Sequence, residues 1–375
     1  MSLLVREVRL TDFRNFRDRV VEPAEALTIL VGHNAVGKTN TVEAMQLLTT
    51  GASFRHPRAC ELLRDGAEKG RAAARLAGDG RVIDVELNLT PTKRAFRRNG
   101  KPCRAADLLG TLMSVLFCPD DLALVKGSAS LRRQGIDSFG SQAHPGYDKV
   151  CRTYARAVEQ RNSFLKEPWC DPTLLDAWDE SIALGAATLL AHRLSLFARL
   201  VPHVASVYAD ISGGETLECR YECSLGDEAL GLDRDGLREL AFERVRAARE
   251  QDRRLGRTGV GPHRDDIRVH IDDRDARAFG SQGQQRSIVL AFKLAEAAVI
   301  DRTLDQRPVL LLDDVLSELD EARRRYFMGF ISNDLQTFIT TTNAECLSRE
   351  VREQARIVNL DQEEVCGDEA FRYLR

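Results

Sequence analysis

The chain has 375 residues, of which 43% are hydrophobic and 30% are charged, a composition typical of a soluble globular protein large enough for two lobes. Its net charge of −3 and pI of about 6.2 exclude a globally basic surface, so any nucleic-acid binding must come from local patches. No run approaches the roughly 18 apolar residues of a membrane span, and no signal-peptide pattern is present, so we expect a cytoplasmic protein with no membrane partner. The cysteines are scattered, which predicts reduced thiols.

The N-terminal part of the chain has the alternation of β-strands. Residues 3–10 alternate between apolar and polar side chains, and residues 11–17 contain a turn. Residues 26–31 form a short apolar strand that leads through a glycine-bounded loop into a helix at about 39–48. Later strands are expected at 72–76, 82–89 and 115–117, with a hairpin at 93–104 whose turn is Asn99-Gly100.

The middle of the chain changes to a helical period. Apolar residues recur at spacings of three and four over 147–166, 174–208 and 236–255. Pro202 and Gly213-Gly214 occur in this region, and the apolar seams are too short and broken for a long coiled coil. This region is therefore expected to be a compact helical insert.

The C-terminal part returns to an α/β pattern. A helix is expected after Phe279, and strands are expected at 309–312 and 337–341. This return predicts two lobes. One is an α/β head built from 1–135 and 256–375, with a mixed sheet and an antiparallel β subdomain, and the other is an inserted, mainly helical arm at 136–255.

A glycine-rich loop follows the apolar strand at 26–31. It matches G-x-x-x-x-G-K-[ST], and together with the next residue it comprises Gly32, His33, Asn34, Ala35, Val36, Gly37, Lys38, Thr39 and Asn40. Glycines let backbone N–H groups turn toward phosphates, and the helix N-terminus adds partial positive charge. Lys38 would reach the β- and γ-phosphates, and Thr39 would offer its hydroxyl to Mg²⁺. The loop therefore predicts a nucleoside triphosphate with Mg²⁺.

Two carboxylates end the apolar strand at 309–312. A strand buried on both faces should not end at Asp313 and Asp314 unless a cation lies there. Asp313 would hold Mg²⁺, and Asp314 would polarise the attacking water, acting in catalysis beside Lys38. An acidic loop after a core strand is the alternative, which the P-loop makes less favoured.

The helix expected after Phe279 begins with an unusual number of hydrogen-bonding side chains. They are Ser281, Gln282, Gly283 and Gln284, with no strong acid or base among them. The segment lies some 250 residues after the P-loop and about 30 before the acidic strand. This order and spacing resemble an ABC-type ATPase head, and an ordinary serine N-cap is the alternative.

The resemblance to an ABC-type head implies a role for these polar residues. Ser281, Gly283 and Gln284 would occupy the S-x-G-Q positions of a signature motif, which is presented across a dimer interface to ATP held by a second copy. A helix N-terminus suits that partner's triphosphate. Asp320, in the segment Ser317 to Asp320, would lie in the D-loop and cross the same interface.

Motifs along nearly the whole chain narrow the resemblance to the RecF recombination-mediator family. They are Phe13-Arg14-Asn15-Phe16, the P-loop with Glu43-Ala44, Ser53-Phe54-Arg55, Phe117-x-Pro119-x-Asp121-Leu122, Arg132-Arg133, Gln160-Arg161-Asn162, Gly261-Pro262-His263-Arg264-Asp265-Asp266, Ser281 to Arg286 and Leu311 to Asp320. The resemblance implies an ATP-controlled clamp that dimerises on double-stranded DNA near single-strand gaps. It also implies RecR, RecO and RecA as partners, a nucleoid-associated location and a weak, DNA-stimulated ATPase.

The resemblance suggests further residues close to DNA or nucleotide. Arg55 would lie near the nucleotide or DNA, and His263 and Arg264 would lie near the active face. Arg97 and Arg98 belong to a basic hairpin that is a candidate for phosphate contact, although a solvated arginine-rich hairpin is equally compatible with the pattern.

Other P-loop proteins fit the sequence less well. A transporter's energy-coupling subunit leaves the helical insert unexplained, and an SMC-class head would need a longer coiled coil. A P-loop kinase leaves the Ser281 segment without a role, and no NKxD or TKxD segment supplies guanine specificity. Thr340-Thr341-Thr342 stands where many ABC ATPases have a histidine at the γ-phosphate, so we expect slow hydrolysis.

Overall fold

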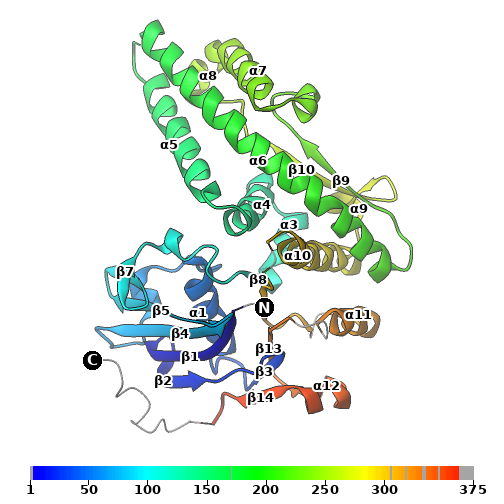
Figure 1. The fold of residues 1–375 in the computed structure, drawn as a ribbon. Helices are drawn as coiled ribbons and strands as arrows, with labels where there is room; N and C mark the ends of the chain where they lie inside the picture. The colour runs from blue at the N-terminus through cyan, green and yellow to red at the C-terminus, as the bar shows by residue number, and fades with distance from the viewer. Residues whose placement is uncertain are drawn as a thin grey trace. The chain divides into compact units, whose positions relative to one another are not determined.

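The computed structural model describes residues 3–169, 171–304, 306–316, 319–331, 335–344 and 347–362. These residues form two compact units (Figure 1). Unit 1 comprises Met1–Pro119 and Ile300–Arg375, and unit 2 comprises Asp120–Val299. From the sequence we predicted lobe boundaries between residues 135 and 136 and between residues 255 and 256. That division into a head and an arm stays a prediction.

Unit 1 contains an antiparallel sheet of six strands. Its order is β2-β1-β4-β5-β6-β7, with β1 at Leu4–Phe13, β2 at Phe16–Val21, β4 at Gly70–Gly78, β5 at Arg81–Thr90, β6 at Lys93–Arg98 and β7 at Lys101–Cys103. β1, β4 and β5 match the strands expected at 3–10, 72–76 and 82–89, and the Asn99-Gly100 turn joins β6 to β7 as predicted. Two short helices border the sheet, α2 at Ala59–Leu62 and the 3₁₀ turn η1 at Ala105–Asp107.

A second sheet of unit 1 is fully parallel. Its order is β14-β3-β13-β12-β8, with β3 at Leu27–Val31, β8 at Ser114–Phe117, β12 at Val309–Leu312, β13 at Thr337–Thr341 and β14 at Arg356–Asn359. All four residues of β12 are buried, as expected for a parallel strand covered on both faces. β14 was not predicted, because its residues are mostly exposed and give little apolar signal.

Helix α1 (Lys38–Thr50) packs between the two sheets of unit 1 (Figure 1). One hydrophobic core includes Met45 and Leu47 of α1, Leu10 of the antiparallel sheet, and Leu311 and Phe338 of the parallel sheet. Two further helices, α11 (Glu321–Ile331) and α12 (Arg349–Gln354), connect the last parallel strands. This packing places the N-terminus of α1 at the carboxyl end of the parallel strands, where ligands bind in open α/β sheets.

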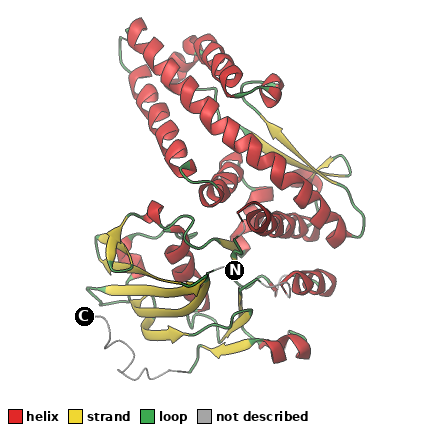
Figure 2. Cartoon of the chain, viewed as in Figure 1, coloured by secondary structure: helices red, strands yellow, loops and turns green. Residues whose placement is uncertain are grey.

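Unit 2 is mainly helical, as Figure 2 shows. Its helices are α3 (Ala123–Lys126), α4 (Ala129–Ala143), α5 (Tyr147–Leu165), α6 (Pro172–Ser212), α7 (Arg234–Ala247), α8 (Arg249–Leu255), α9 (Ala276–Phe279) and most of α10 (Gln282–Leu304), with 3₁₀ turns η2 (Pro119–Leu122) and η3 (Asp227–Gly231). A small antiparallel sheet completes it in the order β11-β10-β9, with β9 at Leu217–Glu222, β10 at Asp266–Ile271 and β11 at Arg274–Asp275.

Helix α6 covers the helical pattern predicted over 174–208 and contains Pro202 in its interior. It continues to Ser212, where Gly213 closes it at a φ of +77°. A proline inside a helix costs about 3 kcal/mol, and packing of the apolar stripe of α6 against α5 and α7 offsets that cost. By length and apolar content alone α6 could cross a membrane, but its buried side chains face the other helices of unit 2, as in a core helix of a soluble protein. The predicted helix at 236–255 is two helices, α7 and α8.

Candidate nucleotide-binding site

The glycine-rich loop at 32–37 joins β3 to α1. Gly37 has a φ of +115°, and a Cβ atom there would lie 2.3 Å from Cζ of Phe16, so this position requires glycine. Lys38, which is 8% exposed, donates from Nζ to the carbonyl oxygens of Gly32 at 2.6 Å and His33 at 2.9 Å. These bonds hold the ammonium group at the loop and leave its third N–H for a phosphate oxygen.

A hydroxyl and a carboxylate meet beside this loop. Thr39 Oγ1 donates to Oδ1 of Asp313 at 2.8 Å, and Thr340 Oγ1 donates to the same oxygen at 3.0 Å. Asp313 is 4% exposed, and burial raises the pKa of its carboxyl group, while the hydroxyls of Thr39 and Thr340 act in the opposite direction. The sequence predicted that Thr39 and Asp313 share one site, and the structure brings them together.

This pair fits a magnesium ion. Mg²⁺ prefers oxygen ligands and is commonly held by one or two carboxylates together with substrate phosphates. Within the described ranges, no group of three or more His, Cys, Asp or Glu side chains could hold a metal on its own. An ion at Thr39 and Asp313 would therefore depend on the phosphates for part of its coordination.

Asp314 differs from its neighbour in both conformation and exposure. Its φ of +54° lies in the left-handed region, which is uncommon for a residue other than glycine. Its backbone N–H donates to Thr340 Oγ1 at 2.8 Å. Thr340 thus ties both aspartates to β13. Asp313 is buried while Asp314 is exposed, so the two carboxylates occupy different environments.

Glu43 connects two separate segments to the P-loop helix. Its side chain is fully buried and accepts two hydrogen bonds from Arg14, at 2.8 and 2.9 Å, and one from Ser53 at 2.6 Å. The guanidinium of Arg55 lies 3.6 Å from the same carboxylate. Sequence reasoning included Arg14, Glu43 and Ser53 in motifs without assigning them a role, and the structure shows that they form one network.

A chain of amides links Arg55 to the P-loop. Arg55 Nη1 donates to Oδ1 of Asn40 at 2.9 Å, and Nδ2 of Asn40 donates to Oδ1 of Asn15 at 2.7 Å. Nδ2 of Asn15 donates in turn to the carbonyl oxygen of Val36 at 2.7 Å. Arg55 is therefore connected to the P-loop, and its closeness to nucleotide or DNA stays a prediction.

Asp361 is a residue of the site that sequence reasoning missed. It follows β14, and both carboxylate oxygens accept the backbone N–H of His33, at 3.1 and 3.2 Å. Oδ2 also lies 2.9 Å from Nδ1 of His33. The hydrogen bond from the backbone of His33 is the main cause that lowers the pKa of Asp361, with smaller contributions from the His33 ring and Lys38. A single acidic residue after a strand is too common to signal such a contact.

The predicted signature residues begin α10 in unit 2. Gln284 N–H donates to Ser281 Oγ at 3.2 Å, and Ser281 N–H donates to Oε1 of Gln284 at 2.9 Å, so the two form a capping box. Nε2 of Gln284 also donates to Glu215 at 2.8 Å. Ser281 and Gln282 are exposed, and Gly283 is half-buried. The serine N-cap that the sequence offered as an alternative is therefore present, and it leaves the Ser281 hydroxyl proton free to donate.

Asp320 lies directly before α11. Its Oδ1 accepts the backbone N–H of Arg323 at 2.9 Å, and its carboxylate pairs with the Arg323 guanidinium, so it caps that helix. Ser317 and Glu318 of the predicted D-loop segment lie outside the described residues. The role of Asp320 across an interface stays a prediction.

His263 and Arg264 are held within unit 2. Nδ1 of His263 accepts from the Tyr154 hydroxyl at 2.7 Å, and Nε2 donates to the carbonyl oxygen of Thr258 at 3.0 Å. Burial lowers the pKa of His263 to about 4, so the ring is neutral at pH 7. Arg264 donates to the same carbonyl at 2.9 and 3.2 Å. Their closeness to nucleotide or DNA stays a prediction.

Arg97 and Arg98 of the basic hairpin β6–β7, which were predicted together, differ in their side-chain contacts. Arg98 donates to the carbonyl oxygen of Asp107 at 3.1 Å and to Thr111 Oγ1 at 3.2 Å. The Arg97 side chain is exposed and has no ion-pair or hydrogen-bond partner among the described residues. Of the two, Arg97 is therefore the better candidate for phosphate contact.

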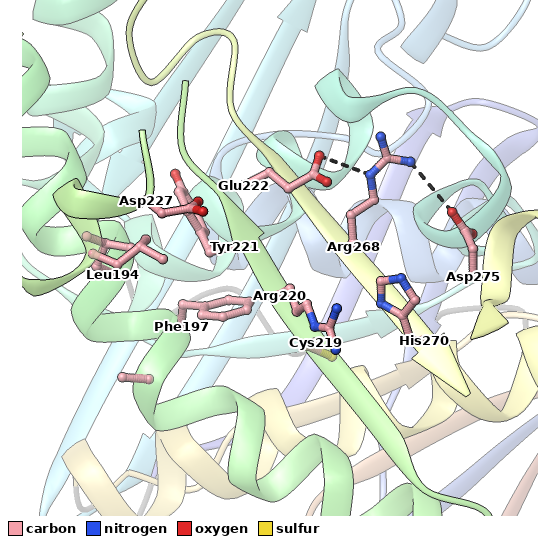
Figure 3. A pocket seen from close by; sticks show the side chains of 12 residues that line it. Leu194, Phe197, Cys219, Arg220, Tyr221, Glu222, Asp227, Arg268, His270 and Asp275 are labelled. Carbon is pink, nitrogen blue, oxygen red and sulfur yellow. Dashed lines mark hydrogen bonds and ion pairs between the residues drawn. The ribbon is translucent and has the colours of Figure 1, made fainter. Parts of the chain in front are cut away.

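Unit 2 also contains a cavity that none of the predicted site residues lines (Figure 3). Both arginines that line it are paired within the protein: Arg268 contacts Glu222 at 3.0 Å and Asp275 at 3.6 Å, and Arg220 contacts Glu218 at 2.6 Å. These arginines are already neutralised, so the cavity offers little attraction to an incoming phosphate.

Sequence comparison places the chain among known proteins. Residues 4–365 match the family model described as RecF/RecN/SMC N terminal domain. The DNA replication and repair protein RecF of Gloeobacter violaceus is 36% identical over 367 residues, covering 96% of this chain and 97% of that protein. The protein of the same name from Heliobacterium modesticaldum is 38% identical over 363 residues, covering 95% and 97%.

Solved structures agree with this assignment. The recombination mediator protein RecF-ATP in the RecFOR pathway aligns with a TM-score of 0.86 at 30% identity, covering 92% of this chain and 94% of that one. The Smc head domain of Pyrococcus furiosus aligns with a TM-score of 0.56 at 16% identity, a likeness that shows the fold alone. These matches confirm the predicted ABC-type ATPase head and its resemblance to RecF. The chain therefore belongs to the RecF family.

Proposed function

We propose that this protein is an ATP-dependent DNA clamp of recombinational repair. It dimerises with ATP on double-stranded DNA near single-strand gaps and releases the DNA after slow hydrolysis. The observation that carries the proposal is the convergence of Lys38, Thr39 and Asp313 at one loop, with Asp314 exposed beside them. Relatives named DNA replication and repair protein RecF support the biological setting.

Different residues of unit 1 bind the nucleotide and take part in its hydrolysis. The backbone of the loop 32–39 and Lys38 bind the β- and γ-phosphates. Thr39 and Asp313 hold Mg²⁺, which neutralises phosphate charge when it is bound. The exposed Asp314 orients and deprotonates the attacking water. Thr340 holds Asp313 and Asp314 in place, as its two hydrogen bonds suggest.

A second copy of the chain completes the site. The N-terminus of α10 presents an exposed serine whose hydroxyl proton is available. The first N–H groups of a helix have no intrahelical carbonyl acceptor, and of these the Gln284 N–H is bonded to Ser281 Oγ. Such a helix start favours a negatively charged ligand. We therefore assign Ser281, Gln282, Gly283 and Gln284 to the γ-phosphate bound by the partner, and Asp320 to the same interface.

DNA and protein partners follow from the same proposal. A relative's structure is described as part of the RecFOR pathway, and we extend this to RecO and RecR as partners of this chain in loading RecA. The net charge of −3 leaves DNA contact to local cations. Arg97 is the leading candidate because it is exposed and unpaired within the described residues, and Arg55, His263 and Arg264 are kept as weaker ones.

The experiment that tests the proposal measures nucleotide-dependent DNA binding. Wild type and Lys38→Ala are titrated with gapped, duplex and single-stranded DNA at several salt concentrations, with and without Mg²⁺ and ATP. Light scattering follows the mass of the complex. We expect ATP to produce a dimer and to tighten duplex and gapped DNA binding in wild type only. If ATP changes neither mass nor DNA affinity, the clamp proposal is wrong and an ABC-type ATPase with another output remains.

A further inference from the structure

The peptide unit between Gly32 and His33 makes a hydrogen bond on each side. Its carbonyl oxygen, which belongs to Gly32, accepts from Lys38 Nζ at 2.6 Å. Its N–H, which belongs to His33, donates to the carboxylate of Asp361 at 3.1 and 3.2 Å. The peptide is trans, so its C=O and N–H point in opposite directions. Asp361 and Lys38 therefore hold the same rigid plane from opposite sides.

Asp361 is itself held by several contacts. The preceding residue, Leu360, donates its backbone N–H to the carbonyl oxygen of Val31 at 2.8 Å, which extends the pairing of β14 with β3. The N–H of Asp361 donates to Oδ1 of Asn359 at 2.9 Å. Arg19, which is 4% exposed, donates to the backbone carbonyls of Asn359 and Gln362 on either side of Asp361. The carboxylate thus comes from a segment whose backbone is fixed.

Space around the loop supports a close and specific fit. A Cβ atom on Gly32 would lie 3.3 Å from Oδ1 of Asp361 and 2.7 Å from Cγ1 of Val36. A side chain at residue 32 would therefore push against both the loop and the carboxylate. The negative charge of Asp361 also polarises the peptide in the direction that makes its carbonyl a better acceptor for the Lys38 ammonium.

We propose that Asp361 is a positioning residue for Lys38: it fixes the Gly32–His33 peptide so that the peptide's carbonyl holds the ammonium group ready for the β- and γ-phosphates. This inference rests on the proposed ATP site and adds to it a residue from the last strand of the parallel sheet. Asp361 does not touch the nucleotide in this account. It lowers the cost of ordering a long, flexible lysine side chain before ATP arrives.

Calorimetric titration with Mg²⁺ and ATP tests the proposal on the full chain. Asp361→Ala removes the acceptor, and we expect it to weaken ATP binding roughly tenfold, the effect of losing one hydrogen bond to a charged group. Asp361→Asn keeps an oxygen for the His33 N–H and should recover most of that loss. Glu22→Gln is the matched control, because Glu22 pairs with Arg356 on β14 at 3.2 Å but does not contact the loop; its affinity should equal that of wild type.

A double-mutant cycle separates positioning from general damage to the pocket. In a Lys38→Ala background the peptide carbonyl has no ammonium to hold, so adding Asp361→Ala should change ATP affinity less than twofold. Equal losses in the two backgrounds would overturn the proposal, as would wild-type affinity in Asp361→Ala alone. The comparison of Asp361→Asn with Asp361→Ala decides the matter if Lys38→Ala binds too weakly to measure. Absence of ATP binding by wild type would refute the proposed function instead.

Discussion

Thr39 donates a hydrogen bond to Asp313 at 2.8 Å, although 274 residues separate them in the chain. The first residue lies at the start of α1 and the second lies directly after β12. The strands that precede them, β3 and β12, run in the same direction in one parallel sheet, so the carboxyl ends of these strands lie at the same edge of the sheet. This contact is the geometric basis of the proposed magnesium site.

The magnesium site can be tested through this contact. Asp313→Asn removes the charge that attracts the ion, and we expect Mg²⁺-dependent ATP binding to weaken at least tenfold. Thr39→Ser keeps the hydroxyl and serves as the control, with affinity close to that of wild type. Mg²⁺ titrations at fixed ATP provide the measurement. Unchanged magnesium dependence in Asp313→Asn would remove this residue from the site.

Asp314 is expected to act in hydrolysis rather than in binding. Its carboxylate is exposed while that of Asp313 is buried, so Asp314→Asn should bind ATP within about twofold of wild type. Removal of a general base typically lowers turnover by about 10² to 10⁴. Single-turnover phosphate release at saturating ATP measures the effect. Normal turnover would show that another group activates the water.

The signature residues can be tested by mixing two inactive variants. Ser281→Arg should abolish the ATP-driven dimer while leaving ATP binding to a single chain, and Lys38→Ala should bind ATP too weakly to form the dimer. If Ser281 serves the partner's nucleotide, a mixture of the two variants contains one intact composite site and regains dimer formation with part of the ATPase activity. No recovery in the mixture, with each variant still folded, would contradict a site shared between two copies.

Glu43 is expected to be a major contributor to the stability of unit 1. It is fully buried and accepts three hydrogen bonds from Arg14 and Ser53. Glu43→Gln leaves the Arg14 guanidinium without its anionic partner, at a cost of roughly 1 to 3 kcal/mol. Glu61→Gln is the control, because Glu61 pairs with Arg58 at the surface and such pairs contribute little. Urea unfolding of both variants measures the difference, and equal midpoints would contradict the prediction.

His263 should make unfolding depend on pH. Its pKa is about 4 in the folded chain and about 6.5 when exposed, so the unfolded state takes up a proton first as the pH falls. Stability is therefore fully present above pH 6.5 and declines between pH 6.5 and 4. At pH 5.5 the loss amounts to roughly 1 kcal/mol. His263→Gln cannot titrate, so its urea midpoint should fall less than that of wild type between pH 7.5 and 5.5.

The P-loop and the acidic strand could be found from the sequence because their signals are local. Four apolar residues followed by Asp313 and Asp314, and glycines at fixed distances from Lys38, each reflect a constraint within a few neighbouring residues. The apolar period over 174–208 likewise indicated the long helix α6 in spite of Pro202, because packing on neighbouring helices outweighs the local propensity of one proline.

Contacts between distant segments could not be found in this way. Asp361 follows a short, largely exposed strand that carries little apolar signal, and its partner His33 lies 328 residues away. Arg14, Glu43 and Ser53 were recognisable as parts of motifs, yet their shared network depends on how a hairpin turn, a helix and a loop pack together. Hydrogen bonds of this kind carry no sequence periodicity.

The sequence by itself determined the chemistry of this protein: a phosphate-binding loop, a pair of carboxylates and a polar helix start, because glycine, lysine and carboxylate side chains are required at fixed local spacings. Only the tertiary structure decided which residues support that chemistry. Parallel pairing of β14 with β3 brings Asp361 to the P-loop, and packing of α1 between two sheets buries Glu43 beneath Arg14. These relationships depend on which elements lie side by side, and that is set by burial of the whole core rather than by any local pattern.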